Sequence, residues 1–346
     1  DAVSKLAVRD FIKQLNQDHK TTVILTTHDM QDIEALTNRI LLIGNGRILM
    51  DGSPEELKQD AASMDEAVVK LYRSFDEKEG KKYLSFFRMR FLMGLQYRAA
   101  AAAGVVTQFT WGFMELLVFR AFYQADASAF PMSFEAVASY IWLQQAFLAL
   151  FMAWMMEAEI FSSIVDGNIA YEMCRPVHIY SMWFARSVAN RVSKALLRCA
   201  PILVVALFLP KPYRLILPQD PMTLFLFLLT MILGTLVTVA IGVIIYTSCC
   251  FTISAQGIRI FYASACELLS GQIVPLPFMP EVVQRVLKVL PFAAMQNVPF
   301  RIYSGDLSGR AMAEAIFLQI FWLIVLVAGG WMFAKFAEKK IVVQGG

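Results

Sequence analysis

The sequence predicts a mainly α-helical fold, in which six membrane-spanning helices follow a smaller soluble α/β part. Of the 346 residues, 58% are hydrophobic and only 17% are charged, and the mean hydropathy is +0.54. This is more apolar surface than a soluble globule can bury. Residues 1–100 nevertheless carry dense charge, whereas several later stretches of about 20 residues carry almost none. The two regions therefore face different solvents.

The charge and the cysteine pattern exclude two classes of site. The net charge is only +3, and no Lys/Arg cluster is interleaved with aromatic residues, so we expect no nucleic-acid partner. The five cysteines lie in or near apolar segments without metal-ligand spacing, and we expect no metal site. The chain opens on Asp1, without an initiating Met or a signal peptide, and we expect the native start to lie upstream.

The first 36 residues have the pattern of an α/β unit. Apolar residues recur at helical spacing over residues 4–15, which predicts an amphipathic helix. The β-branched run at residues 21–26 predicts a strand buried on both faces of a parallel sheet. His28 follows this strand, at the edge where open α/β sheets bind their ligands, and a further helix follows His28.

A hairpin and a third helix follow. Apolar runs flank Gly44-Asn45-Gly46, and Asn-Gly tolerates the positive φ angles of a tight turn, so residues 39–51 are predicted to form a hairpin. Ser53-Pro54-Glu55-Glu56 supplies an N-cap, a proline in the first turn and a capping-box glutamate. A helix is therefore predicted to begin there.

Three segments now carry a specific resemblance. DAVSK (1–5), VILTTHDMQDIEAL (23–36) and RILLIGNGRILMDGSPEEL (39–57) occur in the order found in the last third of an ABC transporter ATP-binding domain, which they resemble. The resemblance implies that residues 1–60 are the C-terminal fragment of such a domain. It also implies that Asp1 is the D-loop aspartate and that His28 is the switch histidine, which contacts the γ-phosphate and helps to hold the attacking water.

The same region lacks the other parts of a nucleotide site. No G-x-x-x-x-G-K-[ST] occurs, and no acidic strand end precedes Asp1 to bind Mg²⁺. We therefore expect this chain alone to bind no cofactor and to hydrolyse no ATP; ATP and Mg²⁺ require a complete nucleotide-binding domain. The LSGQ at residues 269–272 is similar to the family's signature loop, but it follows His28 within an apolar span and receives no role.

Residues 61–81 are predicted to form a polar helix and a linker, produced either by a gene fusion or by read-through. The basic, aromatic helix at residues 81–98 has two interpretations: it lies in the cytoplasmic headgroup layer, or it is a solvated helix that leads into the first span.

Six apolar stretches predict membrane spans at about 101–123, 137–156, 195–210, 222–250, 260–276 and 313–334. Most basic residues near the span ends fall on one side, which predicts that both termini are cytoplasmic.

Two membrane-part segments resemble the six-span permeases of ABC type-2 exporters, and the resemblance covers residues 82–340. IVDGNIAYEMCRPVHIY (164–180) lies in the loop after the second span, where the family's coupling helix contacts the ATP-binding domain. This implies coupling roles for Asp166, Gly167, Arg175 and Pro176. LLSGQIVPLPFMPEVVQRVLKVLPFAAMQNVPFRIYSG (268–305) resembles the short fifth span, its proline-rich re-entrant turn and an outer amphipathic helix. Free backbone groups at these prolines must be shielded by protein or line a wet cavity.

Ionisable groups within the spans are costly in hydrocarbon and mark either a pathway or a bond between helices. Glu115 and Glu267 are candidates for the translocation path, with structural hydrogen bonding as the other interpretation; Glu157 and Glu159 lie near a membrane edge.

The sequence thus favours the permease of an ATP-driven ABC exporter in the cytoplasmic membrane of a bacterium. Its expected partners are lipid, a second permease half in a homo- or heterodimer, and a complete ATP-binding subunit or domain. The alternative is an ion-gradient-driven secondary transporter using Glu115 or Glu267. A membrane enzyme lacks support, because the apolar segments contain no HExxH and no Ser/His/Asp set. Nothing in the sequence selects a substrate.

Overall fold

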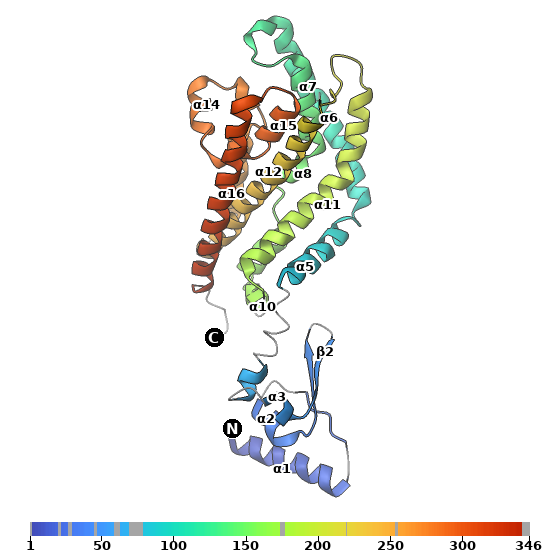
Figure 1. The fold of residues 1–346 in the computed structure, drawn as a ribbon, viewed down its shortest axis with the longest axis vertical. Coiled ribbons are helices and arrows are strands. Elements are labelled where there is room, and N and C mark those ends of the chain that lie inside the picture. The colour runs from blue at the N-terminus through green and yellow to red at the C-terminus, as the bar shows by residue number, and fades with distance from the viewer. Residues whose placement is uncertain are drawn as a thin grey trace. The chain divides into compact units, whose positions relative to one another are not determined.

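The computed structural model describes residues 2–19, 22–26, 30–44, 47–58, 63–68, 79–173, 177–218, 220–252 and 255–340. The chain divides into two compact units, Asp1–Lys82 and Tyr83–Gly346. Both units are rich in helix, and within the described residues strands occur only in the first unit (Figure 1). The mainly α-helical fold with a small α/β part is therefore confirmed.

The first unit contains α1 (Ala2–His19), α2 (Met30–Leu36), β1 (Ile40–Gly44), β2 (Arg47–Gly52) and α3 (Pro54–Lys58). Helix α1 packs against α2, and the Arg9 guanidinium lies 2.5 Å from the Asp32 carboxylate. Strands β1 and β2 pair antiparallel, which confirms the hairpin, although its turn residues Asn45 and Gly46 lie outside the described part. Ser53 and Glu56 exchange the two hydrogen bonds of a capping box at the start of α3.

The strand predicted at residues 21–26 is not formed. Residues 22–26 belong to no strand or helix, and Ile24 is 89% exposed. A strand of a parallel sheet needs neighbours on both sides, and the only sheet in the described part of this unit is the β1–β2 hairpin, which pairs with itself.

The second unit is helical throughout its described residues. Its α-helices are α5 (Glu79–Gly94, beginning at the end of the first unit), α6 (Arg98–Ala125), α7 (Phe134–Ala146), α8 (Leu148–Phe151), α9 (Ala158–Val165), α10 (Ile169–Met173), α11 (Ile179–Phe208), α12 (Pro221–Ser248), α13 (Ala255–Leu269), α14 (Glu281–Leu287), α15 (Asn297–Tyr303) and α16 (Gly309–Glu338). Short 3₁₀ helices are η1 (Ala127–Ala129), η2 (Cys249–Phe251), η3 (Leu276–Phe278) and η4 (Pro291–Ala294).

Helix α7 forms the centre of this unit. All its residues from Ala136 to Ala146 are buried, because α6, α11 and α15 pack around it. The Tyr140 ring meets Phe300 of α15 edge-on at 5.4 Å, and the Trp142 Nε1 donates to the Tyr213 carbonyl at 2.8 Å. The buried polar side chains of this helix, Ser139, Gln144 and Gln145, all donate hydrogen bonds, as buried polar groups are expected to do.

Three described helices are long and apolar enough to cross a membrane by length and composition: Arg98–Ala125, Pro221–Phe251 and Gly309–Glu338. They contain the predicted spans at 101–123, 222–250 and 313–334. The other three predicted spans fall on shorter or more polar elements. The described part of helix α13 has 15 residues, and α11 carries Arg186, Arg191, Lys194 and Arg198 in addition to its apolar second half.

The second predicted span, 137–156, is not one continuous helix. Helix α7 ends at Ala146, α8 adds one turn, and residues 152–157 are not helical. Arg191 of α11 is buried there, and its guanidinium donates to the carbonyls of Ala149, Leu150 and Met152 at 3.4, 3.0 and 2.9 Å. These bonds satisfy carbonyls that a helix end leaves free, which the hydropathy of residues 137–156 does not reveal.

The backbone just before the proline-rich segment that follows α13 is bonded to the central helix α7. The Tyr140 hydroxyl donates to the Gly271 carbonyl at 3.3 Å, and the Gln144 amide donates to the Gln272 carbonyl at 2.5 Å. Both donors come from α7, so the central helix satisfies backbone groups that lipid cannot.

Candidate functional site

The loop that contains α9 and α10 precedes α11, and α10 lies at the end of the second unit where α11 begins (Figure 1). Asp166 is the C-cap of α9, and Gly167 follows with φ +74°. This left-handed conformation ends many helices and favours glycine. No atom lies within 4 Å of the position that a Cβ would occupy at Gly167, so conformation and not space selects the glycine.

Helix α10 has one anchored side and one exposed side. Ile169 is buried at 3% exposure, and the Glu172 carboxylate accepts from the Trp183 Nε1 of α11 at 2.7 Å. Tyr171 is 75% exposed, and Val165 at the end of α9 is 66% exposed. The loop thus offers an apolar surface while it remains fixed to α11.

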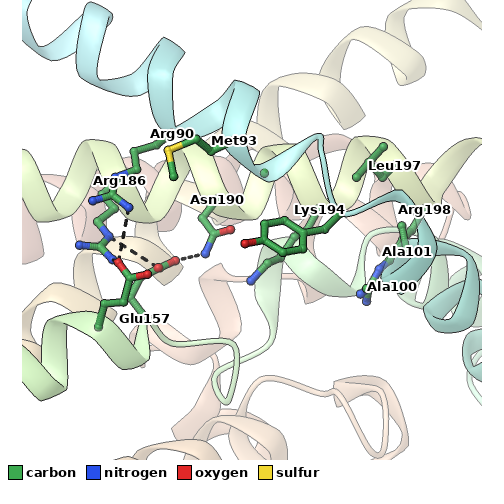
Figure 2. A pocket seen from close by; sticks show the side chains of 13 residues that line it. Arg90, Met93, Ala100, Ala101, Glu157, Arg186, Asn190, Lys194, Leu197 and Arg198 are labelled. Atoms are coloured by element: carbon green, nitrogen blue, oxygen red, sulfur yellow. Dashed lines mark hydrogen bonds and ion pairs between the residues drawn. The ribbon is translucent and has the colours of Figure 1, made fainter.

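A network of charged groups joins this loop to α5 and α11 (Figure 2). Arg186 of α11 is buried, and its guanidinium contacts the carboxylates of both Glu157 and Glu159. The Asn190 amide also donates to Glu157. Arg90 of α5 lies 3.5 Å from the Glu159 carboxylate. A buried charge requires such partners, so the beginning of α9 is tied to two helices at once.

The loop is also tied to α12. The backbone N–H of Glu157 donates to the Tyr246 hydroxyl at 2.7 Å. The rings of Phe161 and Trp183 meet the Tyr246 ring edge-on at 5.0 and 6.1 Å. Arg259 of α13 lies over the Phe161 ring at 4.8 Å. A displacement of α9 would therefore reach α11, α12 and α13 through direct contacts.

A cavity of about 360 Å³ adjoins this network, between α5, the first turn of α6 and α11. Four of its lining residues on α11 recur at every fourth position: Arg186, Asn190, Lys194 and Arg198. This spacing places them on one side of the helix. From the sequence, the basic residues Arg186, Lys194 and Arg198 served only to orient the spans. Their spacing of four or eight residues within one helix is the signal that predicts this cationic face of α11.

The structure places only some of the predicted site residues. Asp166 and Gly167 end α9, as described above. Asp1, His28, Arg175 and Pro176 lie outside the described residues.

The two glutamates that the sequence predicts within spans lie on different helices. Glu115 of α6 accepts a hydrogen bond from the Gln145 amide of α7 at 3.2 Å, and its Oε1 is buried without a hydrogen-bond partner in the described part of the chain. Glu267 lies half-buried on α13. No hydrogen bond joins the two carboxylates among the described residues.

In its N-terminal region the chain is similar to curated ATP-binding proteins. It is 37% identical over 71 residues to the aliphatic sulfonates import ATP-binding protein SsuB of Burkholderia thailandensis, covering 20% of this chain and 21% of that protein. It is 48% identical over 44 residues to the thiamine import ATP-binding protein ThiQ of a Chelativorans species, covering 13% and 18%. It is 43% identical over 51 residues to SsuB of Escherichia coli, covering 15% and 20%. The chain spans about a fifth of the length of these relatives.

The membrane part gives a broader match. The sequence model of a family described as "ABC-2 family transporter protein" matches residues 109–343. The match covers α7 to α16 and most of α6, including the loop of α9 and α10, the charged network of Arg186 and the proline-rich segment. Because it extends over more than half of the chain, this protein belongs to the ABC-2 family of transporter proteins.

Proposed function

We propose that this chain is the permease of an ATP-driven exporter in the cytoplasmic membrane and that the loop of α9 and α10 receives the motion of the ATP-binding domain. The observation that carries the proposal is that this loop exposes apolar side chains, Val165 and Tyr171, while its carboxylates at Glu157 and Glu159 are anchored to the buried Arg186 of α11. Exposed apolar side chains can bind the ATP-binding domain, and the anchored carboxylates can transmit its motion to α11.

The proposed mechanism is mechanical. Closure of the nucleotide dimer displaces α9 and α10, with Asp166, Gly167, Arg175 and Pro176 at the contact. Arg186 and Asn190 pass the displacement to α11, and Tyr246 passes it to α12. Two permease halves, from a homo- or heterodimer, then alternate between inward-open and outward-open states. The spans perform no covalent chemistry.

The first unit is proposed to be part of an ATP-binding domain. Its similarity to ATP-binding proteins supports this, and so does the exposure of Val23, Ile24 and Leu25, which neighbouring strands of a larger sheet would cover. In the complete domain, His28 contacts the γ-phosphate and Asp1 belongs to the D-loop, with ATP and Mg²⁺ bound mainly by residues outside this chain.

The proposed direction is export. The relatives named above are import proteins, but their similarity is confined to the N-terminal region, which supplies energy and does not set direction. The direction rests on the resemblance of residues 164–180 and 268–305 to exporter permeases.

ATP hydrolysis is the first test. The chain, and the chain extended through its native reading frame, are placed in nanodiscs and assayed for ATPase activity, with His28→Ala as the control. We expect activity only in the extended form, and we expect His28→Ala to abolish it. An inert extended form would show that the first unit is not the working ATPase, and a separate ATP-binding subunit would then be sought.

A second test addresses the coupling loop. Gly167→Ala is compared with Gly305→Ala, because both glycines have positive φ (+74° and +77°) and neither has an atom within 4 Å of a Cβ position. Each change strains the backbone by about 1–2 kcal/mol. We expect Gly167→Ala to lower the ATPase activity of the assembled transporter several-fold and Gly305→Ala to leave it near wild type. Equal effects would contradict a coupling role for this loop.

A further inference from the structure

We propose that the cavity between α5, α6 and α11 binds the phosphate of an anionic phospholipid. The cavity lies in the second unit, and its charged lining residues come from α5, α11 and the start of α9. Binding of a phospholipid here is independent of the proposed coupling to ATP hydrolysis, because it depends only on the charges of the cavity and on contact with the membrane.

The cavity has a surplus of positive charge. Four cationic side chains line it, Arg90, Arg186, Lys194 and Arg198, against the two carboxylates of Glu157 and Glu159. Arg186 and Arg90 are paired with those carboxylates. Lys194 and Arg198 form no hydrogen bond or ion pair with any described residue that would neutralise them. The cavity therefore carries two positive charges that its own side chains do not balance.

Two of the lining guanidinium groups are partly withdrawn from water, those of the paired Arg90 and the unbalanced Arg198. The Nε atoms of Arg90 and Arg198 are buried and have no hydrogen-bond partner within the described chain. Gly104 allows the Arg198 side chain to lie against α6, because a Cβ at that glycine would come within 2.7 Å of the guanidinium carbon. A buried donor without an acceptor is unfavourable, and a phosphate offers several acceptor oxygens to such donors.

The beginning of α6 adds to the attraction. This helix of 28 residues starts at Arg98 without a side-chain cap, and Ala100 and Ala101 of its first turn line the cavity. The N–H groups of Arg98 and Ala101 already donate to the carbonyls of Gln96 and Tyr97, but the remaining free N–H groups of a helix start carry partial positive charge and favour anions. Here the helix start supplements a cationic side-chain site.

The rest of the lining is apolar, which favours a phospholipid over free phosphate. Met93 and Tyr97 line the cavity and are 46% and 70% exposed. Leu197, Ala100 and Ala101 complete this side. Further along α6, Val106 is 68% exposed, within a helix suited to cross the bilayer. A headgroup phosphate near Lys194 would thus have its acyl chains beside apolar side chains of α5 and α6.

The test measures lipid binding to the purified chain in detergent. Its thermal stability is followed during titration with phosphatidylglycerol, phosphatidylcholine or inorganic phosphate, and bound lipid is counted by native mass spectrometry. Lys194→Gln/Arg198→Gln removes the two unbalanced charges. Lys194→Arg/Arg198→Lys keeps them, and Lys288→Gln removes an exposed lysine that lies outside the cavity.

We expect phosphatidylglycerol to stabilise the wild type more than phosphatidylcholine does, and its affinity to fall at least about tenfold in the Gln/Gln variant, because charge-assisted hydrogen bonds to phosphate are lost. The charge-keeping variant and Lys288→Gln should bind as the wild type does. If the Gln/Gln variant does not fold, Lys194→Gln alone is used with the same expectation. Equal effects of the two lipids, undiminished binding in the Gln variant, or full stabilisation by inorganic phosphate alone would each overturn the proposal.

Discussion

Arg186 and Arg90 contact the same network but differ in burial. The Arg186 side chain is 5% exposed and faces Glu157, which is 13% exposed. The Arg90 side chain is 23% exposed, and its partner Glu159 is 73% exposed. Removing one member of a buried pair leaves an uncompensated charge, whereas an exposed pair contributes little. The two arginines are therefore expected to contribute differently to the free energy of unfolding, although the sequence alone does not distinguish them.

We expect Arg186→Met to destabilise the fold by about 3 kcal/mol, because among the described residues Asn190 is then the one side chain that still donates to the Glu157 carboxylate. Arg90→Met should cost less than about 1 kcal/mol, because Glu159 remains solvated. Thermal unfolding in detergent, followed by tryptophan fluorescence, compares the two. Similar shifts for both variants would show that burial does not govern this network.

Glu115 distinguishes ATP-driven from ion-driven transport. Its hydrogen bond from Gln145 favours a structural role, whereas its Oε1, which has no hydrogen-bond partner among the described residues, is an oxygen that can bind a proton. Glu115→Gln keeps a carbonyl that accepts from Gln145 but cannot titrate. We expect this variant to retain its thermal stability and its transport.

Transport is measured in proteoliposomes supplied with ATP, using a substrate found by its stimulation of ATPase activity, with a proton gradient imposed or collapsed. Ion-driven transport would be favoured if Glu115→Gln stops transport without changing thermal stability. It would also be favoured if the wild type transports only while the proton gradient is present.

At the scale of elements, close packing of α12 depends on one glycine. A Cβ at Gly234 would come within 2.6 Å of the Met295 carbonyl oxygen, whereas a Cβ at Gly242 of the same helix would meet nothing within 4 Å. Gly234→Ala must therefore displace backbone that follows η4, and Gly242→Ala displaces nothing.

We expect Gly234→Ala to destabilise the fold by about 1–3 kcal/mol through overpacking. Gly242→Ala should be neutral or slightly stabilising, because alanine has the higher helix propensity. Thermal unfolding of the two variants in the same detergent measures the difference. A Gly234→Ala variant as stable as Gly242→Ala would show that the contact between α12 and residue 295 is looser than described.

The short elements show where hydropathy alone misjudges boundaries. Residues 137–156 are apolar enough for one span, yet no helix continues beyond Phe151, where Arg191, distant in sequence, donates to the carbonyls of Ala149, Leu150 and Met152. The capping box of Ser53 and Glu56 was predicted correctly, because its two hydrogen bonds are local.

At the scale of the whole molecule, the proposed topology has six spans with both termini cytoplasmic. It predicts that residue 171 is reached by a membrane-impermeant thiol reagent only from the cytoplasmic side, and residue 128 only from the other. Both positions are exposed in the structure. Tyr171→Cys and Ser128→Cys, each made in a variant lacking the native cysteines, are labelled in intact cells and in inverted vesicles. Labelling of both positions from the same side would exclude the six-span arrangement.

In the first unit, the elements stabilised by local contacts were predicted correctly, and the strand that requires distant partners was not. Residues 39–57 form the expected hairpin and helix, since each is stabilised by neighbours in sequence. Residues 22–26 form no strand, since a buried parallel strand is stabilised by distant strands that the described residues do not contain.

The sequence by itself determined the membrane class, the mainly helical fold, the hairpin and the family, because these depend on composition, local periodicity and short motifs. Only the tertiary structure decided which charges meet: Arg186 pairs with Glu157, Arg191 bonds to the end of α8, and Lys194 and Arg198 line a cavity without an ion pair to any described carboxylate. The helical spacing places Arg186, Lys194 and Arg198 on one side of α11, but the packing of α5, α6 and α9 against that side decides which of these charges are neutralised.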